Sequence, residues 1–267
     1  YTTLFRSPDM DCTCAAHCYA VLKKKLDPET EYIPIRTGPL NGQIRDVFRL
    51  AGIDQPRHVD TIAPSVGMVA RSSPVVLKPD DPVLEAIREV ENQTISAIPI
   101  INDDHSFAGV VGVNEITSYV LAQNRGERPL YSFLVRNFRR VLPGRELQTG
   151  DTLQFEAPIV TGSMPDDRSI ELIAKLPVRP LLVVGNRPEI LRHAVDSQLP
   201  AVVITGLGKD DEIAVDMSSF RGAIYLSSTD TAETIRLLRL SSPVRTIMDA
   251  DVPQLGADTP FDTAKNT

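Results

Sequence analysis

The stretch Val75-Val-Leu-Lys-Pro-Asp-Asp-Pro-Val-Leu-Glu-Ala-Ile87 joins a short apolar run to an amphipathic segment through a polar turn. The turn is typical of a helix start, with Asp80 in the N-cap position and Pro82 in the first turn. We therefore expect a strand over residues 73–77 and a helix over residues 83–92.

Two further apolar runs follow this helix. They are Ile95-Ser-Ala-Ile-Pro-Ile-Ile101 and Phe107-Ala-Gly-Val-Val-Gly-Val113, and the polar residues Asn102-Asp-Asp-His105 separate them. Two such runs around a polar turn predict a hairpin. A second helix is expected over residues 114–122, which completes a small α/β unit spanning residues 60–123.

The same pattern starts again near the end of the chain. With an offset of 178 residues, the distance from Val66 to Val244, similar residue types recur at six positions. These are Val66, Val69, Leu77, Asp80, Pro82 and Ala86 in the first copy, and Val244, Ile247, Leu255, Asp258, Pro260 and Ala264 in the second. An internal repeat predicts two copies of one supersecondary unit, the second covering residues 243–267.

The repeated unit resembles the CBS domain on the residues quoted above. The resemblance implies that paired units bind adenine nucleotides (AMP, ADP or ATP). It makes Val75, Ile98, Pro99, Asn114 and Glu115 the nucleotide-binding candidates. The apolar pair Ile98 and Pro99 can flank a base, and the helix start near Asn114 can approach ribose or phosphate.

Each of these roles has a plainer alternative. For Ile98 and Pro99 the alternative is core packing, and for Glu115 it is a solvated carboxylate at a helix start. The chain also departs from the family at two positions. It has Gly112 where the family usually has Ser or Thr, and Glu115 where the family has Asp. The hydroxyl donor of this half-site is therefore missing.

After a linker over residues 124–129, residues 130–242 alternate short apolar runs with helical segments. Strands are expected over residues 157–161, 180–185, 201–206 and 223–227, and helices over residues 169–176, 189–197 and 231–240. Apolar runs that end in glycine and lead into helices predict an α/β unit with a mostly parallel sheet.

This unit resembles the DRTGG domain through Leu182-Val-Val-Gly-Asn-Arg-Pro-Glu-Ile190 and Val203-Ile-Thr-Gly-Leu-Gly208. Its glycine-rich turns can accept an anion on backbone N–H groups. The interpretation we favour is a spacer that contributes dimer contacts. The segment Ser227–Thr231 is first of all a helix cap.

Residues 8–59 have the pattern of an α/β segment, with helices expected over residues 10–26 and 42–51. The stretch Ser7-Pro-Asp-Met-Asp-Cys-Thr-Cys14 resembles the first motif of the DHH phosphoesterases, and most closely that of the manganese-dependent inorganic pyrophosphatases. The resemblance makes Asp9 and Asp11 metal ligands. Their hard oxygen atoms suit Mn²⁺, and also Mg²⁺ or Co²⁺. Taken alone, such a pair would be interpreted as a helix cap.

Cys12, Cys14, His17 and Cys18 form a cluster that looks like a second metal site. Only some of these side chains share a helix face. A zinc site usually draws on two separated ligand pairs. We therefore interpret the cysteines as buried and reduced.

Both ends of the chain are unusual. Residues 1–7, Tyr-Thr-Thr-Leu-Phe-Arg-Ser, match one reading frame of a widely used DNA-sequencing adapter, and Phe5 stands where the resemblance requires a histidine ligand. The last residues begin a helix and then stop. We therefore expect a fragment truncated at both ends, inactive by itself, with the remaining catalytic residues unknown.

The composition limits the classes of partner. Hydrophobic residues make up 42% of the chain, which is enough to form buried cores. The net charge of -7 argues against binding to nucleic acid or to an anionic membrane. No apolar run is long enough to span a bilayer. Three cysteines without a visible signal peptide predict a cytoplasmic protein.

The order of the units matches that of CBS-containing pyrophosphatases. The expected reaction is hydrolysis of pyrophosphate to two phosphates by a metal-bound hydroxide. The protein would act as a homodimer controlled by adenine nucleotides. The alternative is a non-catalytic CBS/DRTGG nucleotide-sensing regulatory protein.

Overall fold

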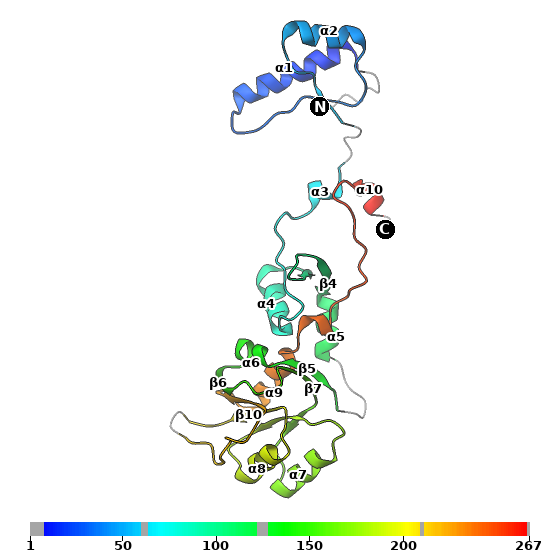
Figure 1. The fold of residues 1–267 in the computed structure, drawn as a ribbon. Coiled ribbons are helices and arrows are strands. Elements are labelled where there is room, and N and C mark those ends of the chain that lie inside the picture. Colours follow the sequence, from blue (N-terminus) through cyan, green and yellow to red (C-terminus); the bar gives the residue numbers. More distant parts are fainter. Residues whose placement is uncertain (1–7, 60–63, 122–127, 209–210, 266–267) are drawn as a thin grey trace. The chain divides into compact units, whose positions relative to one another are not determined.

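The computed structural model describes residues 8–59, 64–121, 128–208 and 211–265. The chain divides into two compact units (Figure 1). One unit comprises the residues up to Arg71 together with those from Pro253 onward, and the other comprises Ser72–Val252. In the described part, no helix is long and apolar enough to cross a membrane. The expectations for residues 1–7 lie outside the described residues.

In the first unit, α1 (Met10–Leu26) and α2 (Gly42–Ala51) have the predicted bounds. The Asn41 side chain accepts a hydrogen bond from the N–H of Ile44 at 2.9 Å and caps α2. Gly52 ends α2 in the left-handed conformation, with φ of 65°.

The sheet of this region is very small. It consists of β1 (Ile35–Arg36) and β2 (Arg57–His58), which are parallel. The stretch Glu31–Arg36 has the apolar pattern of a strand, but only its last two residues form one. The buried core comprises Leu40, Ile44 and Phe48.

Two short helices complete the first unit. They are α3 (Val66–Val69) and α10 (Phe261–Ala264), which lie far apart in the sequence. Backbone hydrogen bonds join their starts. The N–H of Val66 donates to the carbonyl of Thr259, and the N–H of Phe261 donates to that of Pro64, both at 2.9 Å.

The second unit begins with a ββ hairpin between two helices. The elements are α4 (Val83–Gln93), β3 (Ala97–Ile101), β4 (Phe107–Gly112) and α5 (Val113–Leu121). The strands are antiparallel, as the hairpin prediction requires.

Single residues extend this hairpin on both edges. Leu77 forms a parallel bridge to Ile100, and Asp249 forms an antiparallel bridge to Val110. The strand predicted over residues 73–77 is thus wrong apart from Leu77. Pro74 has no N–H to donate, so it does not support a longer ladder.

The largest sheet has five strands in the order β6-β11-β10-β9-β8. They are β6 (Gly144–Gln148), β8 (Ile159–Thr161), β9 (Leu181–Val184), β10 (Ala201–Thr205) and β11 (Ala223–Ser227). Strands β8 to β11 are parallel and β6 is antiparallel. The prediction of a mostly parallel sheet is confirmed, and the apolar β9 and β10 are buried along their whole length.

Helices cover both faces of this sheet. Helices α7 (Asp166–Lys175) and α8 (Pro188–Asp196) pack on one face, in a core that includes Leu182 and Val202. Helix α9 (Thr231–Leu240) packs on the other face, against Leu181 and Val183. Alternate residues of one strand therefore serve two separate cores.

Several elements before the parallel strands were not anticipated. Strands β5 (Tyr131–Leu134) and β7 (Gln154–Ala157) form an antiparallel pair. The segment between them contains α6 (Val135–Val141) and the edge strand β6. A single turn of 3-10 helix, η1 (Val244–Thr246), follows α9.

The sequence repeat has a counterpart in the hydrogen bonds. In the first unit, Val66 donates to Thr259 and Phe261 donates to Pro64. In the second unit, Val244 donates to Asp81 at 2.8 Å and Val83 donates to Ser242 at 2.9 Å. Each donor and acceptor of one unit lies 178 residues from its counterpart in the other. The two copies therefore make the same local backbone contacts.

Candidate functional site

The candidate metal ligands Asp9 and Asp11 lie at the start of α1. Asp9 is the N-cap, and its Oδ1 accepts a hydrogen bond from the N–H of Cys12 at 2.8 Å. This backbone hydrogen bond lowers the pKa of the Asp9 carboxyl below its ordinary value. Asp9 therefore caps α1 in this structure, as the alternative interpretation expects. Its proposed role as a metal ligand stays a prediction.

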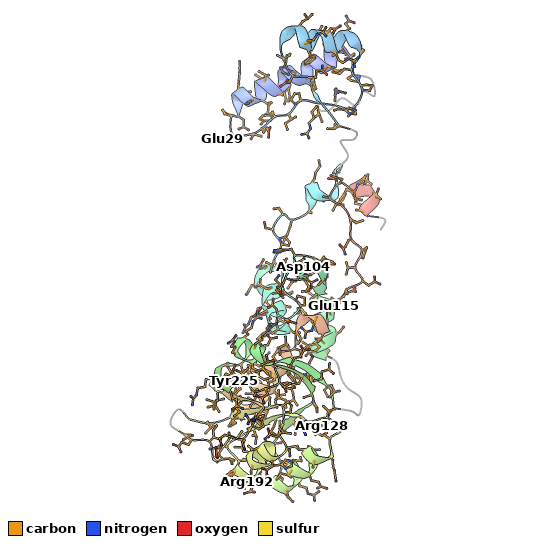
Figure 2. All side chains as sticks on the ribbon, in the orientation of Figure 1. Glu29, Asp104, Glu115, Arg128, Arg192 and Tyr225 are labelled. Atoms are coloured by element: carbon orange, nitrogen blue, oxygen red, sulfur yellow. The ribbon has the colours of Figure 1, made fainter. Side chains whose placement is uncertain are left out.

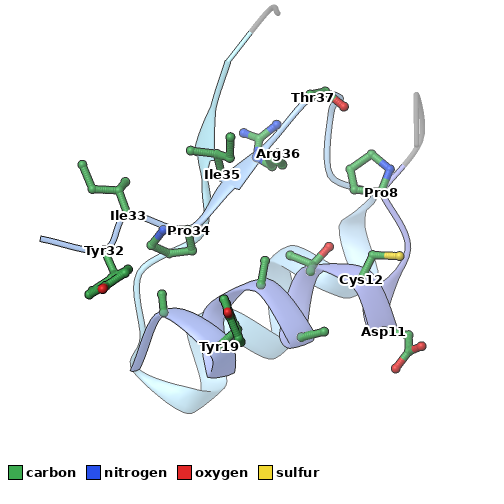
Figure 3. A pocket seen from close by; sticks show the side chains of 14 residues that line it. Pro8, Asp11, Cys12, Tyr19, Tyr32, Ile33, Pro34, Ile35, Arg36 and Thr37 are labelled. Atoms are coloured by element: carbon green, nitrogen blue, oxygen red, sulfur yellow. The ribbon is translucent and has the colours of Figure 1, made fainter. Parts of the chain in front are cut away.

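Asp11 lies at the rim of an open pocket of about 670 Å³. The pocket is bordered by one face of α1 and by the segment Tyr32–Thr37, and Tyr19 and Ile33 lie on its opposite sides (Figure 3). In that view the Asp11 carboxylate points away from β1. Together with Asp9, it offers carboxylate oxygens at one end of a helix.

Among the residues that the structure describes, no three His, Cys, Asp or Glu side chains gather as a metal site would require. The cysteine cluster does not form such a group. Cys14 packs against the small core around Phe48, and the ring of His17 lies edge-on to Phe48 at 6.0 Å. The prediction that the cysteines are buried is wrong: Cys12 and Cys14 are half-buried, and Cys18 is exposed.

The nucleotide-binding candidates lie in the hairpin and at the start of α5. Ile98 is fully buried in the core, which agrees with the core-packing alternative. Pro99 and Val75 are half-buried, and Asn114 is exposed. Their roles in nucleotide binding stay predictions.

The Glu115 carboxylate is half-buried and makes a hydrogen bond to the backbone. It lies where β4 passes into α5, in the upper part of its unit in Figure 2. Its Oε2 accepts a hydrogen bond from the N–H of Gly112 at 2.9 Å. A Cβ atom at position 112 would lie 2.8 Å from this oxygen, so a larger residue there would require the carboxylate to shift.

The N-cap prediction for Asp80 is wrong. Pro82 occupies the N-cap position of α4, whereas the Asp80 carboxylate forms ion pairs with Arg136 and Arg245. These two arginines come from distant segments, so tertiary contacts replaced the local cap. Next to this cluster, the buried side chain of Asn137 donates to the Asp80 carbonyl at 2.9 Å.

A second group of ion pairs joins α4 to α6. The Arg140 guanidinium contacts Asp81 at 2.8 Å and Glu85 at 2.5 Å. Within the second unit, the segment at the start of α4 is therefore joined to α6 by ion pairs as well as by a shared apolar core.

In the glycine-rich loop after β10, an aspartate of the same loop accepts a hydrogen bond from a backbone N–H. The N–H of Gly208 donates to Asp211 Oδ2 at 2.8 Å. The predicted cap of α9 is confirmed, because Asp230 accepts from the N–H of Glu233 at 2.9 Å. The first of these hydrogen bonds removes one donor from a possible anion site.

Comparisons with known proteins agree with this arrangement. The family model of the CBS domain matches residues 66–122. The chain is also similar to a "Probable manganese-dependent inorganic pyrophosphatase" of Thermotoga maritima, with 20% identity over 257 residues. That alignment covers 95% of this chain and 46% of the relative.

Two other relatives have similar descriptions. A "Cobalt-dependent inorganic pyrophosphatase" of Clostridium perfringens is 20% identical over 254 residues, covering 94% of this chain and 46% of the relative. A probable manganese-dependent inorganic pyrophosphatase of Bacillus licheniformis is 38% identical over 58 residues, covering 22% of this chain and 18% of the relative. The chain spans about half the length of the first two relatives.

A solved structure shares the fold. It is the crystal structure of the CBS and DRTGG domains of the regulatory region of Clostridium perfringens pyrophosphatase, complexed with the activator diadenosine tetraphosphate. The TM-score is 0.64 with 16% identity, over 76% of this chain and 88% of that chain. The chain thus contains a CBS domain at residues 66–122 and has the fold of a CBS–DRTGG regulatory region.

Proposed function

We propose that this sequence serves in a metal-dependent inorganic pyrophosphatase, which hydrolyses pyrophosphate to two phosphates under the control of adenine nucleotides. The observation that carries the proposal is the alignment with a pyrophosphatase over 95% of this chain. The CBS–DRTGG fold supports the regulatory part of the proposal. The assignments of residues 8–59 to a catalytic domain and of residues 243–267 to a second CBS domain belong to the same proposal.

In this proposal, Asp9 and Asp11 hold Mn²⁺, Co²⁺ or Mg²⁺. Two carboxylates at a helix start fit the hard oxygen donors that such ions prefer. A two-metal site needs more ligands than these two, and none gathers around them among the described residues. When bound, the metal ions lower the pKa of water and neutralise the charge of the substrate.

The sensing role falls to the CBS domain, with AMP, ADP or ATP as ligands. Pro99 and Asn114 are the accessible candidates for contacts with the base and the ribose. We further propose a homodimer. It is supported by apolar side chains of α5 that remain 44–68% exposed, namely Val113, Val120 and Leu121.

The second candidate function is a regulatory protein that senses nucleotides without catalysis. The resemblance of Pro8–Cys14 to a metal-binding motif speaks against it, since a sensor has no use for such a motif. The two functions differ in one property: only the first requires the Asp9 and Asp11 carboxylates.

The test is a chimera. Residues 8–265 replace the aligned part of the Thermotoga maritima relative, and release of phosphate from pyrophosphate is measured with Mn²⁺ or Co²⁺. We expect activity that changes when AMP or ATP is added, and loss of activity in the Asp9→Asn/Asp11→Asn double variant.

The controls separate the two functions. A variant at an exposed carboxylate outside the motif, Asp46→Asn on α2, should keep full activity. A folded chimera that is equally active without Asp9 and Asp11 would refute the metal role. A chimera whose rate of phosphate release is the same with and without each adenine nucleotide would refute the sensing role.

A further inference from the structure

Two buried polar atoms lie where α6 meets the segment that follows α9, and within the described residues neither has a hydrogen-bond partner. They are Oδ1 of Asn137, a residue that is 0% exposed, and Oγ of Ser242, a residue that is 1% exposed. The amide nitrogen of Asn137 is already used. It donates to the carbonyl of Asp80 at 2.9 Å and to that of Ser241 at 3.1 Å. An acceptor without a donor and a hydroxyl without an acceptor therefore lie on neighbouring segments.

This pair is unfavourable in a protein interior. A buried polar atom without a partner has lost its hydration and gained nothing in return. A hydrogen bond from the Ser242 hydroxyl to Asn137 Oδ1 would satisfy both atoms. Since Asn137 already holds the adjacent residue, Ser241, a small shift of the segment after α9 is enough to form it. The contact between Asn137 and Ser242 thus has a second, better satisfied arrangement within reach.

Backbone hydrogen bonds hold the present arrangement. The carbonyl of Ser242 accepts from the N–H of Val83 at 2.9 Å, and the N–H of Val244 donates to the carbonyl of Asp81 at 2.8 Å. The residue with the unpaired hydroxyl is therefore the one that anchors the start of α4. A shift of Ser242 relative to α6 would move α4 with it.

The same segment, residues 241–249, also reaches the hairpin. Asp249 and Val110 exchange two backbone hydrogen bonds of 2.8 and 2.9 Å. Val110 pairs in turn with Pro99, one of the nucleotide-binding candidates. Between Asp249 and Ser242 the chain forms the 3-10 turn η1 and has little slack. A ligand that displaces β3 and β4 would therefore also displace Ser242, and packed contacts of this kind change between discrete arrangements.

We propose that Asn137 and Ser242 form a two-state contact that couples the CBS domain to the five-stranded sheet. Without a nucleotide their side chains are unpaired. With a nucleotide bound, Ser242 Oγ donates to Asn137 Oδ1, and α4 shifts relative to α6. Both are positioning residues that do not touch the ligand. The inference rests on the proposed nucleotide-sensing function and adds to it the route by which binding is transmitted.

The test uses the chimera described above, in which AMP is expected to change the rate of phosphate release. The variant Ser242→Ala removes the hydroxyl and keeps the backbone contacts. Its rate without AMP should equal that of the unaltered chimera. AMP should still bind in calorimetry, because the hairpin is intact, but its effect on the rate should fall by about fivefold or more.

A second measurement separates this role from a merely structural one. A hydroxyl without a partner contributes nothing to the nucleotide-free state, so its removal should leave the urea midpoint of the 267-residue chain unchanged or raise it. The matched control is Ser118→Ala, which removes an exposed hydroxyl from α5. It should leave the effect of AMP on the rate unchanged.

The possible failures are distinct. An AMP effect in Ser242→Ala as large as in the unaltered chimera would refute the coupling role alone. A lower urea midpoint of Ser242→Ala would also refute it, because the hydroxyl would then already be paired, for example through a buried water. Absence of any AMP effect in the unaltered, folded chimera would overturn nucleotide sensing and the coupling role together.

Discussion

Residues 8–59 and residues 72–252 have the same kinds of helix-capping residues and apolar runs. They differ in how completely their apolar side chains are buried. In the larger unit, a five-stranded sheet has helices on both faces, and its central strands β9 and β10 are buried along their whole length. In residues 8–59, two strands of two residues each stand beside two helices, and the core has three buried residues.

The surfaces reflect this difference. Leu22, Leu26 and Leu50 of the N-terminal helices are 52%, 71% and 83% exposed. A two-stranded sheet offers too little surface to cover the apolar faces of two helices. Helix signals in the sequence are thus sufficient to form helices, but long-range strand pairing is needed to bury their apolar faces.

The largest effect expected from this difference concerns two leucines. Leu191 of α8 is 0% exposed and Leu50 of α2 is 83% exposed. Leu191→Ala should lower the free energy of unfolding by about 2–5 kcal/mol, because it leaves a cavity in a packed core. Leu50→Ala should change it by less than about 0.5 kcal/mol. Urea denaturation followed by circular dichroism measures both, and equal effects would contradict the comparison.

The next effect is confined to the larger unit and depends on alkaline pH. Burial raises the pKa of Tyr119 to about 12 from an ordinary value of 10, and the phenol donates to the Arg239 carbonyl at 2.6 Å. The unfolded chain loses this proton first, so the stabilisation is complete below pH 10. It should fall by roughly 2–3 kcal/mol as the pH rises to 12.

Denaturation at several pH values measures this loss. The control is Tyr119→Phe, which cannot ionise and should show a smaller loss over the same range. A variant whose stability has the same pH dependence as the unaltered chain would show that Tyr119 does not titrate in this way.

A smaller effect concerns the N-terminal region at acid pH. The pKa of Asp9 is lowered from 3.8 because its carboxylate accepts a hydrogen bond from Cys12. The stabilisation of α1 by this cap is therefore present above pH 3.8, and it is lost as the pH falls through the lowered pKa of the folded state.

The peptide signal in circular dichroism should report a loss of helix on acidification. In Asp9→Asn the cap is retained without a charge, so the acid-dependent part should shrink. An identical loss in both chains would mean that other carboxylates control α1.

The smallest effect is an expected absence of catalysis. The 267-residue chain should release phosphate from pyrophosphate no faster than Mn²⁺ or Co²⁺ in buffer, because two carboxylates do not complete a two-metal site. A colorimetric phosphate assay is sufficient. Turnover that disappears in Asp11→Asn would show that these residues form a working site by themselves.

The sequence predicted best the elements whose ends carry local signals. Helices α1, α2 and α9 have the predicted bounds because Asp9, Asn41 and Asp230 cap their starts. Strand β11 is also as predicted, since its apolar run lies between clear breaks.

Elements that depend on distant partners were missed or misassigned. Strand β5 pairs with β7 about twenty residues later, and nothing local marks either strand. Asp80 looks like a helix cap in the sequence, but Arg136 and Arg245 from other segments pair with it. Ion pairs of this kind leave no trace in a short window of sequence.

The candidate site shows the same limits. Asp9 and Glu115 were named from their motifs, yet the contact of Glu115 with Gly112 was not foreseen. A signal for it exists: a glutamate three residues after a helix N-cap often reaches back to the N–H of that residue. The pattern is harder to recognise here because Gly112 stands where Ser or Thr is usual.

The backbone contacts near Ser242 have a consequence for synthesis on the ribosome. The N–H of Val83 pairs with the carbonyl of Ser242, about 160 residues later. At ordinary translation rates this partner emerges on the order of 10 s after Val83. Throughout that interval the start of α4 lacks this contact, so α4 is translated well before it can complete its native contacts.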